Sequence, residues 1–218
     1  MATRAKRGTG GTAEQTAEQR GRLIAETALR LAGERGWRDL SLADIGEASG
    51  LGLAAVTAET PNKAAVLARF TRMIDEAVLA EPADAGEPAR DRLFDVLMRR
   101  FDALAPYKAG MRAIDRDLRR DPLAALCLLP LLHRSMASML EAARLAADGT
   151  RGAVRVHGLS AIWVRVLDTW LGDDTEDQAR TMKALDRELK RADDVARFFH
   201  RGRRPAAPAD AAGAAEAV

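Results

Sequence analysis

The side chains whose chemistry is easiest to assign in this chain are cations that could contact phosphate groups. Residues 1–22 hold five basic residues, among them Arg4, Lys6 and Arg7, against two glutamates, a net charge of +3. Lysine and arginine release counterions when they contact nucleic-acid phosphates, and a basic N-terminal arm can enter a minor groove. These charges therefore predict a nucleic-acid contact, although they would equally keep a terminal segment soluble.

The segment from Ser41 to Lys63 has the opposite balance. It contains one lysine against three acidic residues, a net charge of −2, and the whole 218-residue chain carries only +2. No global field therefore indicates a polyanionic partner. Glu59 would meet phosphates at short range if this segment approached DNA, so binding would depend on local cations and on the arm.

No set of residues predicts an enzyme, a metal site or a cofactor. No nucleophile has a matched base, and no phosphate-binding glycine loop follows a strand. The three histidines, His133, His157 and His200, are far apart and lack ligand spacing. The single cysteine, Cys127, lies in the run LAALCLLPLL and is expected to be a buried small hydrophobe.

The elements that must position these residues are helices. Alanine and leucine dominate, aromatic residues make up 4%, and no segment reads as a strand, which together predict an all-α fold. A helix over about 16–35 should be followed by two short helices and then a longer one. The local signals are a terminating glycine at Gly36, a capping box of Ser41 with Asp44, a turn at Gly50 and an N-cap at Asn62.

A Pro/Gly-rich stretch at residues 81–88 predicts a boundary before a second helical block. Its most hydrophobic helix begins at Asp121-Pro122 and should be central. The run Leu123–Leu132 is too short to span a bilayer and holds Pro130. The predicted organisation is a disordered basic arm over 1–15, a helix-turn-helix domain over 16–80, a helical domain over 88–200 and a disordered tail over 201–218.

Residues 22–67 resemble, without a gap, the N-terminal domain of the TetR family of bacterial transcription regulators. The matching residues are Ala28, Leu29, Leu31, Gly36 and Trp37 in the first helix, Leu42, Asp44, Ile45, Ala48 and Gly50 in the second helix and turn, and Pro61, Lys63, Ala65 and Leu67 in the fourth helix. The resemblance implies a TetR-like fold with an N-terminal three-helix DNA-binding domain. It is weakest where that family reads DNA, since the residues usual in the family are replaced at Gly52, Leu53, Thr57, Glu59 and Thr60.

The resemblance also implies partners and sites. It implies a non-enzymatic, cytoplasmic transcription regulator, a repressor, that binds a double-stranded DNA operator as a homodimer. The implied DNA-contacting residues are Arg4, Lys6, Arg7, Ser41, Gly52, Leu53, Ala55, Thr57 and Lys63. Helices over about 154–171 and 175–191 would form the dimer. A small apolar effector would lie among Met111, Met136, Met139, Trp163 and Trp170, although plain core packing gives the same helical spacing.

A second resemblance covers Val156 to Leu189. This stretch is similar to the C-terminal part of the ubiquinone-biosynthesis lipid-binding family, which shares the TetR-like architecture, in its Trp-Leu helix end, its acidic stretch Asp173–Asp177 and its Ala184–Arg187 segment. It implies an alternative: a lipid-binding protein with peripheral membrane contact and no DNA partner. The membrane residues would be Val195, Phe198 and Phe199, within a segment over 190–204 of net charge +4, unless the two phenylalanines only cap the core.

Overall fold

The computed structural model describes residues 9–201, with side chains over 16–194, and contains only helices within that range. This confirms the predicted all-α class. The helices are α1 Thr9–Arg35, α2 Leu42–Ser49, α3 Gly52–Glu59, α4 Lys63–Leu79, α5 Ala89–Leu104, α6 Lys108–Arg120, α7 Pro122–Ala142, α8 Gly149–Leu171 and α9 Ala179–Arg201, with a 3-10 turn at Ala105–Tyr107.

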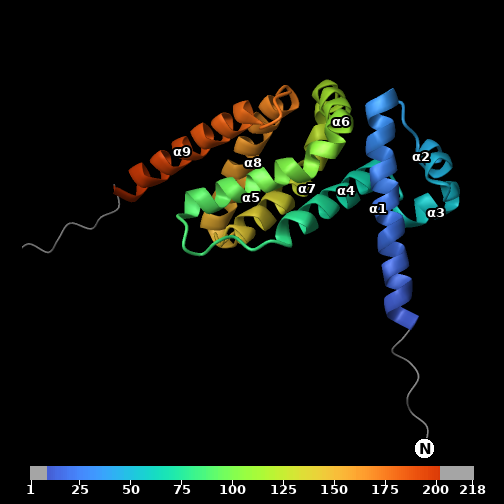
Figure 1. The fold of residues 1–218 in the computed structure, drawn as a ribbon, viewed down its shortest axis with the longest axis horizontal. Helices are drawn as coiled ribbons and strands as arrows, with labels where there is room; N and C mark the ends of the chain where they lie inside the picture. The colour runs from blue at the N-terminus through green and yellow to red at the C-terminus, as the bar shows by residue number, and fades with distance from the viewer. Residues whose placement is uncertain (1–8, 202–218) are drawn as a thin grey trace, which may run out of the picture.

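The helices form two groups joined by α4 and α6. In Figure 1, α1, α2 and α3 lie at one end, α5, α7, α8 and α9 form the body, and α4 runs from the first group into the second. α6 packs against α1, where Gly110 permits close approach because a Cβ there would lie 2.2 Å from the Leu29 carbonyl oxygen. The two groups therefore share one continuous hydrophobic core.

The helix boundaries of the first group follow the predicted local signals. Ser41 and Asp44 form both hydrogen bonds of a capping box at the start of α2. Gly50 ends α2 with φ of 71°, in the left-handed region that favours glycine. Asn62 caps α4 by accepting a 2.8 Å hydrogen bond from the amide of Ala65. One boundary differs, because α1 begins at Thr9, so residues 9–15 of the predicted disordered arm are helical.

The body is organised around stacked aromatic rings. The Phe101 ring lies 4.6 Å from the Trp163 ring in a stacked arrangement and 5.5 Å from the Trp170 ring. Phe101 belongs to the apolar stripe of α5, whose inward positions Leu93, Val96, Leu97 and Leu104 are also buried. α5 therefore packs against α7 and α9, and its Phe101 ring reaches the tryptophans of α8.

The prediction that the helix beginning at Pro122 is central was wrong for its first half. Leu123 and Leu126 of α7 are 69% and 59% exposed, whereas Met136 and Met139 are fully buried. A helix that is apolar all round leaves apolar side chains outside when only one side packs. The same geometry corrects the expectation for Cys127, which is exposed.

α7 extends beyond the apolar run Leu123–Leu132 to Ala142. Its 21 residues are long and apolar enough to cross a membrane by length and composition. Core helices of soluble proteins pass the same test, and the second half of α7 packs in the core through Met136, Met139 and Leu140.

Candidate nucleic-acid interface and ligand cavity

The outer face of α3 consists of small and apolar side chains. Gly52, Leu53 and Thr57, predicted to face a DNA groove, are exposed, whereas Ala55 is half-buried. The Thr57 hydroxyl donates to the carbonyl oxygens of Leu53 and Ala54, at 3.0 and 3.1 Å. This face therefore offers a major groove methyl groups and a hydroxyl whose proton is already used.

The sequence suggested that Glu59 would be free at this surface, but in the structure it is paired. Its carboxylate accepts hydrogen bonds from Arg20 of α1, at 2.8 Å from Nη2 and 3.1 Å from Nε. Arg69 of α4 lies 3.8 Å away on the other carboxylate oxygen, and the Glu59 side chain is only 17% exposed. Two cations therefore compensate the acid, and the three side chains tie the end of α3 to α1 and α4.

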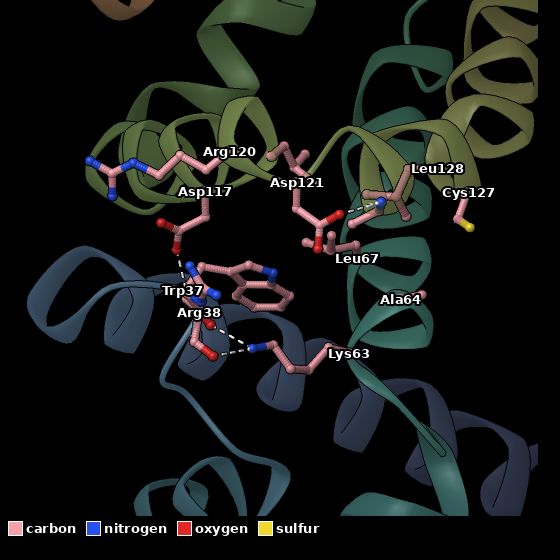
Figure 2. Close-up of a pocket in the computed structure, with 12 residues that line it drawn as sticks. Trp37, Arg38, Lys63, Ala64, Leu67, Asp117, Arg120, Asp121, Cys127 and Leu128 are labelled. Atoms are coloured by element: carbon pink, nitrogen blue, oxygen red, sulfur yellow. Dashed lines mark hydrogen bonds between the residues drawn. The ribbon is translucent and has the colours of Figure 1, made fainter.

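Lys63, predicted to contact a phosphate, instead binds backbone within the protein. Its ammonium group donates to the carbonyl oxygens of Trp37 and Arg38, at 2.6 and 3.0 Å, and lies 4.9 Å from the Trp37 ring centroid (Figure 2). Burial lowers the pKa of Lys63, although Asp117 and Asp39 oppose that change. Lys63 therefore fixes the loop after α1.

The remaining predicted DNA residues divide into two groups. Ser41 is used in the capping box of α2, where its hydroxyl accepts from the Asp44 amide at 3.1 Å and donates to the Asp44 carboxylate. Arg4, Lys6 and Arg7 lie outside the described residues.

A junction cavity of about 430 Å³ lies between the first group of helices and the body (Figure 2). Trp37 and Lys63 line one side, and Asp117 and Cys127 line the other. The Asp117 carboxylate accepts a 2.7 Å hydrogen bond from the Arg38 amide, so α6 is attached directly to the loop that Lys63 fixes.

A second cavity of about 380 Å³, named the inner cavity below, lies where α4, α5, α6, α7 and α8 meet, and its lining includes the exposed Leu129 and Val164. Its volume falls in the range of small-molecule sites. Two of the predicted pocket residues, Met111 and Trp163, line it. The other three, Met136, Met139 and Trp170, are buried in the core and are not among its lining residues.

Most of the lining of the inner cavity is apolar, but a buried polar cluster lies at its wall. Arg100 of α5, which is 5% exposed, donates through Nη1 to the carboxylate of Asp75 on α4. The same carboxylate oxygen accepts from the Ser135 hydroxyl of α7 at 2.7 Å. Burial lowers the pKa of Arg100, and the charge and hydrogen bond of Asp75 oppose that change.

Solved structures with the same architecture exist, while no protein-family model and no curated protein matches this sequence. The TetR transcriptional regulator from Nitrosomonas europaea ATCC 19718 matches with a TM-score of 0.62 and 22% identity over 80% of this chain and 98% of that one. A TetR regulator from Rhodococcus sp. RHA1 matches with 0.58 and 19% over 81% and 97%. A TetR-family regulator from Streptomyces coelicolor matches with 0.52 and 16% over 83% and 89%.

The chain has the TetR-like fold. The fold predicted from the resemblance over residues 22–67 is thereby confirmed. The matching structures named above are described as transcriptional regulators, but identities of 16–22% show only the fold, which the lipid-binding alternative shares. Its membrane residues Val195, Phe198 and Phe199 fall on the backbone of α9, with side chains outside the described range.

Sequence reasoning missed the Arg100 cluster, although one signal was available. Arg100 follows Leu93, Val96 and Leu97 at helical spacing and precedes Leu104 by four residues, so the apolar stripe of α5 places it on the buried face. It also missed a contact between histidines: the rings of His133 and His157 have centroids 4.4 Å apart across α7 and α8. The described residues include no group of three or more potential metal ligands.

Proposed function

We propose that the protein is a DNA-binding transcription regulator of the TetR type, a cytoplasmic repressor whose helix-turn-helix contacts an operator. The observation that carries this proposal is the geometry of α2 and α3. Gly46 brings the two helices together, since a Cβ there would lie 2.8 Å from the backbone of Gly52. The outer face of α3 stays uncovered at one end of the molecule. A short, exposed second helix is the element that such motifs place in a major groove.

Phosphate contacts in this proposal come from the basic arm. Between Ser41 and Lys63 the only cation is Lys63 itself, and it is bonded to backbone carbonyls. Arg4, Lys6 and Arg7 supply the positive charge that the motif lacks. Their contacts would be independent of sequence, whereas the methyl groups on α3 would contact base edges.

Homodimerisation would use α8 and α9. On α8, Val154 is 74% exposed, and Gly158, one turn further along, has open space where a Cβ would lie. An exposed valine beside a glycine allows two copies of a helix to approach closely. A two-fold dimer would place two copies of α3 on successive half-sites of a palindromic operator.

Regulation by a small apolar effector would act through α4. This helix begins at Lys63, which fixes the loop before the helix-turn-helix, and its residues Phe70 and Ile74 line the inner cavity. A ligand that favoured one position of α4 would shift the population of dimers whose reading helices match the operator spacing.

The test is fluorescence anisotropy with DNA from the region upstream of the gene, at two salt concentrations. The wild-type protein should form a sequence-preferring complex that weakens as salt rises. Replacing Arg4, Lys6 and Arg7 together by glutamine should reduce affinity at low salt. It should also make the slope of log affinity against log salt shallower by about three, one for each lost phosphate contact. The matched control replaces three exposed arginines outside α1 to α4, Arg116, Arg134 and Arg144, and should bind as the wild type does. Absence of any complex, with retention on anionic liposomes, would overturn the proposal.

A further inference from the structure

The lining of the inner cavity is mainly apolar but also includes buried polar side chains. Its walls are mainly leucine, isoleucine and aromatic side chains, such as Leu128, Leu132 and Phe70. Arg100 and Ser135 also line it, and both are almost completely buried. A molecule filling the cavity would therefore contact hydrocarbon over most of its surface and a guanidinium group at one place.

That guanidinium group has hydrogen-bonding capacity left over. Nη1 donates to Asp75 and lies 3.8 Å from the sulfur of Met139. Nε is buried and has no hydrogen-bond partner among the residues that the structure describes. A buried donor on a charged group that lacks an acceptor is costly, so an acceptor supplied by a ligand would be stabilised there.

The charges around Arg100 decide which kind of acceptor is favoured. Asp75 already neutralises the guanidinium group, and its side chain is only 15% exposed. The other charged residues of the cavity wall, Arg119 and Asp115, are paired with each other at 2.7 Å. A carboxylate entering this site would add an uncompensated negative charge in a region of low dielectric, which carries a large desolvation cost. An uncharged oxygen pays no such cost.

We propose that the inner cavity binds an apolar molecule with one uncharged carbonyl-type oxygen, which accepts a hydrogen bond from Arg100. The aromatic ring of Trp163, whose centroid lies 5.1 Å from the Arg100 guanidinium carbon, would flank that oxygen. The inference rests on the proposed function only in treating this cavity as the effector site. The binding itself is measured without DNA, so its failure is distinct from a failure to bind an operator.

The experiment compares three probes of equal chain length: 2-nonanone, nonane and nonanoate. Binding of the two volatile probes is measured by headspace gas chromatography over the full-length protein, and binding of nonanoate by calorimetry. Each is repeated with Arg100→Lys, which keeps the positive charge beside Asp75 but removes the Nε donor. The ratio of ketone to hydrocarbon affinity should fall roughly tenfold or more in the variant. The affinity for nonane should be unchanged.

Three outcomes would overturn the proposal. Nonanoate could bind most tightly, which would show that the site takes an anion. The ketone-to-hydrocarbon ratio could be the same in both proteins, as expected if water already satisfies the donor. Finally, both volatile probes could fail to bind the wild-type protein. The ranking of the three probes on the wild type needs no variant, so it tests the proposal even if Arg100→Lys does not fold.

Discussion

The helix-turn-helix and the inner cavity differ in how fully the protein uses its own polar groups. At the helix-turn-helix, Lys63, Thr57 and Glu59 each have partners within the chain. In the cavity wall, Arg100 keeps a buried donor without a partner among the described residues. From the sequence, we expected Lys63 to be available for a phosphate and Glu59 to approach phosphates, and we expected the effector site to be formed by Met and Trp side chains. Residue types and their spacing therefore predict which groups lie at a site. Whether such a group can still bind a partner depends on the hydrogen bonds and ion pairs that it already makes within the protein.

The largest expected effect comes from breaking the buried pair. Asp75→Ala should lower the free energy of unfolding by about 3–5 kcal/mol, because the Arg100 charge would remain buried without compensation. Urea denaturation measures the loss.

The control for this prediction is the double variant Asp75→Ala with Arg100→Met, which removes both charges. It should recover much of the lost stability, since an apolar replacement of a buried ion pair is often tolerated. If the single and double variants were equally unstable, the loss would come from packing around Asp75 and not from the orphaned charge.

The next largest effect distinguishes two roles of Lys63, which are binding backbone carbonyls and contacting a phosphate. Lys63→Met should lower the free energy of unfolding by about 1–2 kcal/mol, because two backbone carbonyls lose a charged donor. If Lys63 contacted a phosphate, the slope of log affinity against log salt would also fall by about one. We expect the stability loss with an unchanged slope, measured by urea denaturation and anisotropy on the same samples.

The fold could be predicted from sequence because its signals are local. The capping box at Ser41, the glycine at Gly50 and the cap at Asn62 each involve residues within a few positions. The fate of Lys63 and Glu59 could not be predicted in this way. Their partners lie 25 and 26 residues away for Lys63 and 39 residues away for the Glu59–Arg20 pair. The prediction for the first half of α7 failed for a related reason, because the sequence of an all-apolar helix does not indicate which side will pack.

A smaller effect is expected when Glu59 is neutralised. Glu59→Gln should change the free energy of unfolding by no more than about 1 kcal/mol, because Arg20 is substantially exposed and such pairs are weak. It would release Arg20 and Arg69 from their acid next to α3, so affinity for DNA should rise and the salt slope should steepen by about one.

The matched control for Glu59 is Glu34→Gln, which breaks an exposed α1 pair with Arg30. Both variants lose one negative charge, so a general effect of net charge would raise affinity equally in the two. A rise confined to Glu59→Gln would show that the Arg20–Glu59–Arg69 cluster restrains DNA affinity locally.

The smallest expected effect tests the contrast at a single hydroxyl. Thr57→Val keeps the methyl group of Thr57 and removes an oxygen whose proton goes to the carbonyls of Leu53 and Ala54. Stability should change by less than about 0.5 kcal/mol, and preference among operator sequences should persist. Thr57→Ala, which removes the methyl group too, should weaken discrimination at any thymine that this position contacts. Loss of base preference in Thr57→Val would mean that the hydroxyl gives up its hydrogen bonds to the α3 backbone and binds a base. The DNA-facing surface of α3 would then contain a polar group that is available for binding.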